Sequence, residues 1–118
     1  MDDEEATSAL IADAKRGLRV VVVMTADSRW DGALDELASA GAEVRTYPDS
    51  ATALYVHAKV IDVDPATSSG RAFVGSENLS VSSLVYNREL GIVTDARGVV
   101  GQLATMVLAD AAGGERWR

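Results

Sequence analysis

The sequence predicts one α/β domain in which helices flank a mixed, mostly parallel sheet. Apolar residues recur at helical spacing over residues 3–16 and 28–40, and a glycine followed by a short strand-like run comes after each segment. The run at 18–24 is nearly all apolar and rich in valine, which is typical of a strand covered on both faces. With 118 residues, 47% of them hydrophobic, the chain has room for a single domain over residues 1–118.

The second half of the chain predicts short strands joined by turns, followed by a last helix. Turn-forming residues at 65–70 indicate a hairpin, and residues 76–87 look irregular. Asp95 is a candidate cap for the last helix, which Gly113 and Gly114 would end. The strands expected after the second helix are 43–47, 54–63, 72–74 and 89–94.

Composition excludes several classes of function. The net charge is −7 and the pI is about 4.5, which argues against a general polyanion-binding surface. The chain has no cysteine, so disulfides, thiolate nucleophiles and cysteine-ligated metals are excluded. The apolar run at 20–24 is too short to span a bilayer. The first residues are acidic and resemble no secretory signal, so we expect a cytoplasmic location by default, unless the start of the chain is truncated.

The candidate chemistry centres on His57, the single histidine of the chain. A lone histidine in an apolar strand is by default a core residue, but Lys59 follows two positions later and Asp64 seven positions later, giving H-x-K-x-x-x-x-D. Because side chains alternate along a strand, His57 and Lys59 are expected on one face. Asp64 falls on the opposite face, so we interpret it as a structural residue near the turn.

Two further motifs follow: G-S-x-N at Gly75, Ser76 and Asn78, and N-R-E-L-G, which contains Glu89. Together with H-x-K-x-x-x-x-D they resemble the phospholipase D superfamily, whose signature combines these elements around a hairpin. The resemblance covers most of the chain from about residue 9. It implies a phospholipase D-like half-domain that lacks its usual first strand, and Gly75, like Asp64, would be a structural part of the motif.

The resemblance also implies a role for each residue in phosphodiester hydrolysis. An imidazole nitrogen of His57 would attack phosphorus and form a covalent phosphohistidine. Lys59, Ser76 and Asn78 would bind the phosphate oxygens. Glu89 would accept a hydrogen bond from the second imidazole nitrogen. Glu77 departs from the pattern by placing an acid inside the motif, and it should point away from an anionic substrate.

A complete site of this family uses two histidines, a nucleophile and a general acid, and this chain has one. The second would come from another copy in a homodimer or from a missing half. Three functions stay open: a phospholipase D-like enzyme that cleaves or transfers phospholipid head groups, an endonuclease-type phosphodiesterase with a single motif, and a catalytically silent dimerisation half-domain. The acidic charge favours phospholipid over duplex nucleic acid.

Ordinary explanations exist for the separate parts. Residues 75–78 taken alone are a common turn, and Glu89 beside Arg88 is a common surface ion pair. Asp62, Asp64 and His57 could suggest a metal site, but alternate aspartates are more typical of a solvated strand end. We therefore expect a metal-independent hydrolase without a cofactor.

Overall fold

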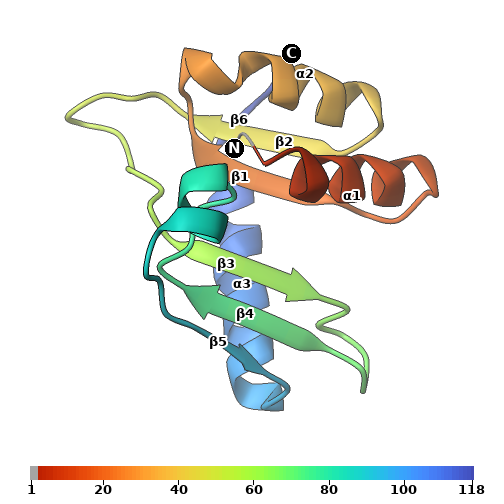
Figure 1. Cartoon of the computed structure of the whole chain (residues 1–118). Helices are drawn as coiled ribbons and strands as arrows, with labels where there is room; N and C mark the ends of the chain where they lie inside the picture. The colour runs from red at the N-terminus through yellow and green to blue at the C-terminus, as the bar shows by residue number, and fades with distance from the viewer. Residues whose placement is uncertain (1–2) are drawn as a thin grey trace.

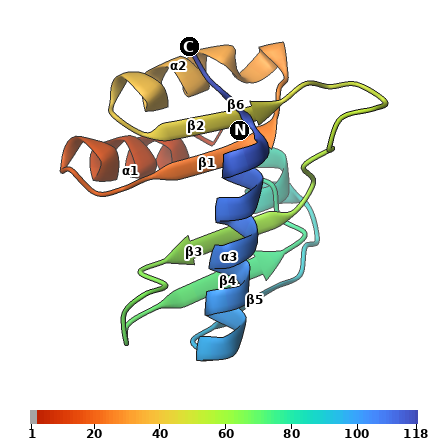
Figure 2. The same ribbon diagram turned by 180° about the vertical axis from the view of Figure 1, so that it is seen from behind.

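Residues 3–118 are described by the computed structural model, and they form two small sheets that share one long helix (Figure 1). The elements in chain order are α1 (Glu4–Lys15), β1 (Val21–Thr25), the 3₁₀-helix η1 (Ser28–Trp30), α2 (Asp31–Ser39), β2 (Glu43–Tyr47), β3 (Lys59–Val63), β4 (Arg71–Gly75), the π-helix η2 (Ser82–Tyr86), β5 (Gly91–Thr94), α3 (Arg97–Gly113) and β6 (Glu115–Arg116). One sheet has the order β1-β2-β6 and the other β3-β4-β5. Seen from behind, α3 crosses both sheets (Figure 2), and it contacts β1, β3 and β4.

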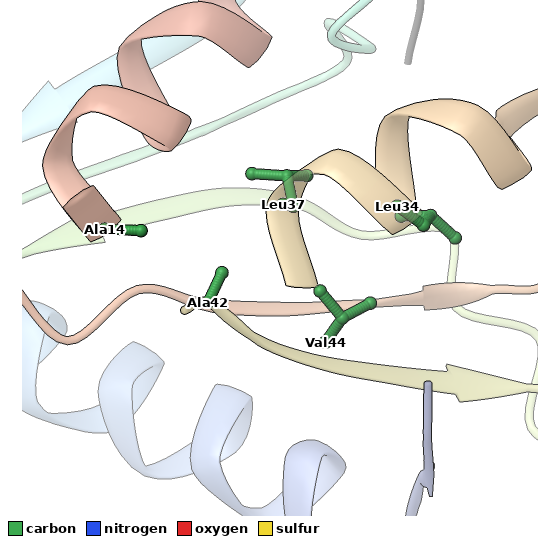
Figure 3. Close-up of a cluster of buried hydrophobic side chains, with 5 residues drawn as sticks. All are labelled: Ala14, Leu34, Leu37, Ala42 and Val44. Atoms are coloured by element: carbon green, nitrogen blue, oxygen red, sulfur yellow. The ribbon is translucent and has the colours of Figure 1, made fainter. Parts of the chain in front are cut away.

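The main core lies between α1, α2 and the first sheet (Figure 3). Leu34 and Leu37 of α2 are fully buried there and meet Val44 of β2, while Ala14 closes the core from α1. The helical spacing of these apolar residues is what directs one face of each helix onto the sheet.

Local chemistry sets the ends of these helices. The Asp3 side chain accepts a 2.8 Å hydrogen bond from the amide of Ala6, which satisfies one of the free donors at the start of α1. After α1 and α2 the chain reverses at Gly17 and Gly41, whose φ angles of 84° and 101° lie in the region that glycine adopts without strain. Both glycines were expected to end these helices, and the structure confirms this.

The second sheet is antiparallel throughout. Lys59 of β3 pairs with Gly75 of β4, and Gly75 pairs in turn with Gly91 of β5. Ala72 of β4 is almost fully buried, as is Val100 of α3, so the face of the sheet that carries Ala72 is the one covered by α3. The opposite face carries exposed apolar side chains, including Ile61 of β3.

The α/β class with flanking helices is confirmed, but the sheet is not continuous or mostly parallel. Only β1 and β2 are parallel, and the pairs β2–β6, β3–β4 and β4–β5 are antiparallel. The valine-rich strand β1 is partly exposed at all five positions instead of covered, because it has a neighbouring strand on one edge alone. The hairpin at 65–70 and the strand at 43–47 are confirmed.

Two local expectations were wrong, and one strand was not predicted. The strand predicted at 54–63 begins at Lys59, because β4, its hydrogen-bonded partner, ends at Gly75 opposite that residue. Asp95 does not cap α3: Ala96 occupies the N-cap, and the Asp95 carboxylate instead lies 3.5 Å from Arg71. The short strand β6 was not predicted, since two polar residues after a helix carry no periodic signal.

Candidate active site

Residues from all three motifs meet at one end of the second sheet. Because the strands are antiparallel, the start of β3, the end of β4 and the start of β5 lie side by side, along the row Lys59–Gly75–Gly91. Ser76 comes directly after β4, and its amide donates a 3.1 Å hydrogen bond to the carbonyl oxygen of Leu90. Segments separated by up to about 30 residues in sequence therefore share one end of the sheet.

The carboxylate of Glu89 is held by three hydrogen-bond donors at this end of the sheet. Its Oε2 accepts a 2.6 Å hydrogen bond from the Ser76 hydroxyl, and its Oε1 accepts from the Ser83 hydroxyl at 2.7 Å and from the Asn87 amide at 3.1 Å. These bonds, the one from Ser76 first, lower the pKa of the Glu89 carboxyl, and the positive charge of Lys59 adds to the effect. Glu89 is therefore a fixed carboxylate.

Glu89 does not contact the imidazole of His57 in this arrangement. Within residues 3–118, the His57 ring makes no hydrogen bond and instead stacks on the Tyr55 ring, with centroids 5.7 Å apart and planes inclined by 19°. His57 is exposed and precedes β3, so its orientation is not fixed by sheet pairing. The inference that strand alternation places His57 and Lys59 on one face therefore does not apply, since His57 lies outside the strand.

Lys59 opens β3 and is half-buried. Its Nζ donates a 2.6 Å hydrogen bond to the backbone carbonyl oxygen of His57. Burial lowers the pKa of the Lys59 ammonium, and the negative charge of Glu89 opposes that change. The ammonium thus lies in the field of Glu89 and beside the backbone of His57, which brings the three residues into one neighbourhood.

The remaining motif residues occupy the rim of this end and the far turn. The side chain of Asn78 is exposed and makes no hydrogen bond within the described residues. Asp64 lies at the other end of β3 with φ 49°, and its carbonyl oxygen accepts from the amide of Thr67 at 2.9 Å and from the Thr67 hydroxyl at 3.1 Å. The backbone of Asp64 thus organises the turn between β3 and β4.

Because Gly75 and Gly91 have no side chains, neighbouring side chains can lie against the backbone at this end of the sheet. A Cβ on Gly75 would lie 2.8 Å from the Phe73 ring and 2.8 Å from the Cα of Gly91, and it would also collide with the Glu77 carboxylate. Phe73 and Glu77 therefore lie directly over these glycines. Oε2 of Glu77 is buried there without a hydrogen-bond partner in the described part of the chain.

Sequence reasoning missed the residues that orient Glu89. Ser83 is buried in η2, and its hydroxyl reaches Glu89 only because this π-helix folds back over the strand ends. Asn87 belonged to the N-R-E-L-G motif but had no assigned role. The sequence signal for its contact with Glu89 was its position two residues before that glutamate. No comparable signal pointed to Ser83.

Comparison with known proteins identifies the fold and the family of this chain. The fold is that of the phospholipase D-type phosphodiesterases: the solved structure of a phospholipase D family member, Nuc from Salmonella typhimurium, matches with a TM-score of 0.79 at 21% identity. The match covers 98% of this chain and 74% of that chain. The family model described as "Cardiolipin synthase, PLD-like domain" matches residues 1–110, so the chain belongs to the phospholipase D-like domain family.

No curated protein sequence matches this chain. None of the helices within residues 3–118 combines the length and the apolar character needed to cross a membrane.

Proposed function

We propose that this domain hydrolyses phosphodiesters through a covalent phosphohistidine at His57. The observation that supports this most directly is the grouping of Lys59, Ser76 and Glu89 at one end of β3, β4 and β5, with the Lys59 ammonium bonded to the backbone of the exposed residue His57. A cation held close to an exposed nucleophile suits phosphoryl transfer, because negative charge develops on the phosphoryl oxygens.

The reaction would proceed in two steps. First, an imidazole nitrogen of His57 attacks phosphorus, the bond from phosphorus to the leaving oxygen breaks, and that oxygen takes a proton from a second histidine. That histidine then removes a proton from water, the water oxygen attacks phosphorus, and the P–N bond breaks. His57 is restored and a phosphate monoester is released. Lys59 and Asn78 would bind the non-bridging oxygens in both steps.

Glu89 would turn toward His57 only in the completed site. In the present arrangement its two oxygens are occupied by Ser76, Ser83 and Asn87. One carboxylate oxygen can accept a further hydrogen bond. Glu89 could therefore keep its hydroxyl partners and also accept a hydrogen bond from the His57 ring once that ring turns toward it, which would fix the imidazole tautomer.

The second histidine must come from outside this copy of the chain, because His57 is the single histidine. We propose that a second copy supplies it across a two-fold axis, so that both copies contribute His57 and Lys59 to one shared site. Activity per molecule should then rise with protein concentration. A missing half carrying its own motif is the alternative.

Phospholipid is the favoured substrate. The description of the matching family model refers to cardiolipin synthase, and the net charge of −7 disfavours a polyanion such as duplex DNA. A single-motif endonuclease remains the second candidate, and a silent half-domain the third.

The test is turnover of an activated phosphodiester in the presence of a chelator. We expect activity that survives the chelator, is lost in His57→Ala and is kept in Thr52→Ala, a control in the exposed loop upstream. Acid-labile label on the wild-type protein would identify the phosphohistidine, and activity retained by His57→Ala would overturn the mechanism. Parallel assays with phosphatidylcholine vesicles and with single-stranded DNA distinguish the two substrate classes. If none of the substrates is turned over at high protein concentration, the silent half-domain is the remaining candidate function.

A further inference from the structure

Three arginines gather near one carboxylate on the first sheet, whereas the candidate active site lies on the second. Nη2 of Arg19 lies 3.4 Å from Oε2 of Glu43, and Nη2 of Arg45 lies 3.0 Å from Oε1 of the same carboxylate. Two guanidinium groups thus share a single counterion. The third arginine is Arg116 of β6, the strand that pairs with β2 on the side away from β1.

The strand register places Arg116 directly opposite Arg45. One step further along, the amide of Trp117 donates a 3.0 Å hydrogen bond to the carbonyl oxygen of Val44. Val44 and Trp117 therefore form a hydrogen-bonded pair, so the neighbouring pair of arginines is of the other type, in which opposed side chains come closest. Like charges placed directly opposite each other are destabilising.

Both arginines lie on the face of the first sheet that is turned to α3. Val44 is buried against α1 and α2, and side chains alternate along a strand, so Arg45 points to the other face. Tyr47 points the same way, and its hydroxyl donates a 2.7 Å hydrogen bond to the carbonyl oxygen of Asp110 in α3. The arginine pair therefore lies near the end of α3.

A ligand can reach this cluster from solvent. The side chain of Arg19 is 69% exposed and that of Arg45 is 29% exposed. Arg116 is exposed as well. Gly114, which follows α3, has no side chain that could cover Arg45: a Cβ on it would lie 3.1 Å from the Cβ of Arg45.

The charges of the cluster do not balance. The hydrogen bond from Arg45 is the main cause that lowers the pKa of the Glu43 carboxyl, so this group is an anion at neutral pH. Within residues 3–118, Arg19 and Arg45 have no ion pair besides Glu43, and Arg116 has none. Three positive charges beside one negative charge leave a surplus of two. This surplus stands out in a chain whose net charge is −7.

A tetrahedral dianion suits this surplus in charge and in geometry. A guanidinium presents its donors in a planar fork that matches pairs of phosphate oxygens. A phosphate monoester carries a charge of about −1.5 to −2 at neutral pH, whereas a phosphodiester carries a single negative charge. The surplus therefore fits one monoester group and is too small for a polymer such as duplex DNA, whose affinity requires many phosphate contacts.

We propose that Arg19, Arg45 and Arg116 form a binding site for a phosphate monoester group, separate from the candidate active site. The phosphate would lie between Arg45 and Arg116 and so remove the repulsion between them, with Arg19 adding charge from the β1 side. The same chemistry serves a lipid head group and a soluble monoester. This site does not depend on the chemistry proposed for His57.

NMR signals of the arginine Nε–H groups test the proposal with the 118-residue protein at low ionic strength. Titration with methyl phosphate should shift the signals of Arg45 and Arg116 saturably. Dimethyl phosphate, the matching diester, should bind at least about tenfold more weakly, and added salt should weaken the binding of methyl phosphate. Equal affinity for the two compounds, or a response confined to the candidate active site, overturns the proposal.

Sedimentation with vesicles distinguishes the two sources of the phosphate. Phosphatidylcholine vesicles are compared with and without added phosphatidate, using wild type and Arg116→Gln. Phosphatidate-dependent sedimentation of wild type alone assigns the site to a lipid head group. Sedimentation of neither protein, with methyl phosphate still bound by wild type, assigns it to a soluble monoester. Equal phosphatidate-dependent sedimentation of both proteins contradicts a lipid phosphate at this site.

Variants of opposite sign locate the binding of methyl phosphate. Arg116→Gln should weaken it at least about tenfold, and Arg71→Gln, the same change at an exposed arginine of the second sheet, should leave it unchanged. Glu43→Gln removes the competing negative charge and should strengthen binding at least about threefold, a gain that partial unfolding does not produce. Lys59→Met should keep this binding, which separates it from the proposed catalysis. Equal losses in Arg116→Gln and Arg71→Gln, or no gain in Glu43→Gln, overturn the assignment.

Discussion

The hydroxyl of Ser76 donates a 2.6 Å hydrogen bond to Oε2 of Glu89, and the same hydroxyl oxygen accepts the amide of Leu90 at 3.2 Å. One side chain thus ties the end of β4 to the segment that enters β5. Ser76 holds the carboxylate as well as the strand ends, which makes it a positioning residue here in addition to any contact with phosphate.

Replacing Ser76 with alanine should release Glu89. Hydrogen bonds lower the pKa of the Glu89 carboxyl, with Ser76 the largest contributor, so in Ser76→Ala that pKa should move up toward its ordinary value. Carboxyl chemical shifts followed against pH measure this directly. We expect activity to fall roughly fivefold, the usual effect of one hydrogen bond. Ser82→Ala is the control, because Ser82 lies in η2 and its hydroxyl does not bind Glu89; an unchanged titration in Ser76→Ala contradicts the assignment.

Lys59→Met should abolish most activity without unfolding the protein. The ammonium is half-buried beside the backbone of His57 and in the field of Glu89, where a fixed positive charge is most effective on a phosphoryl group. The expected loss in kcat is on the order of 100-fold or more. Lys15→Met, at the end of α1, is the matched control. Equal activity in the two variants would exclude Lys59 from the reaction.

Asp62→Val should stabilise the protein at neutral pH. Burial raises the pKa of the Asp62 carboxyl above its ordinary value, so the folded state holds this proton more tightly than the unfolded state does. This group therefore costs no stability at pH values below its unfolded pKa, and the cost develops as the pH rises through the folded pKa. The gain in Asp62→Val should be about 1 kcal/mol at pH 7 and should shrink near pH 3.

Urea unfolding of wild type and Asp62→Val at both pH values measures this difference. Asp49→Val, a change at an exposed loop carboxylate, should show no comparable gain. A gain that is equal at both pH values would mean that titration of Asp62 does not cause it.

Gly75→Ala should destabilise the second sheet. The new Cβ would lie 2.8 Å from the Cα of Gly91, which cannot move without breaking the β4–β5 register, so we expect a cost of about 1–3 kcal/mol in unfolding free energy. Gly101→Ala in α3 is the matched control: nothing lies within 4 Å of its new Cβ, and helix propensity should make it stabilising by roughly 0.5–1 kcal/mol. Thermal unfolding distinguishes the two signs.

Sequence by itself determined the α/β class, the two helices before β2, the β3–β4 hairpin and the family. These follow from local periodicity, from glycines that must adopt positive φ, and from residue types at fixed spacing around His57, Lys59 and Glu89. Each of these signals is contained within a short segment and does not depend on what lies beside it.

Only the tertiary structure decided which strand edges are paired. Apolar runs such as β1 and residues 54–58 have the same composition whether or not a neighbour bonds to them, so the sequence could not reveal that the sheet divides between β1 and β3. For the same reason the parity argument for His57 failed, and the buried, unpartnered carboxylate of Asp62 and the Ser83–Glu89 bond went unpredicted. Strand pairing and burial depend on residues distant in sequence, and alternation within one strand carries no information about them.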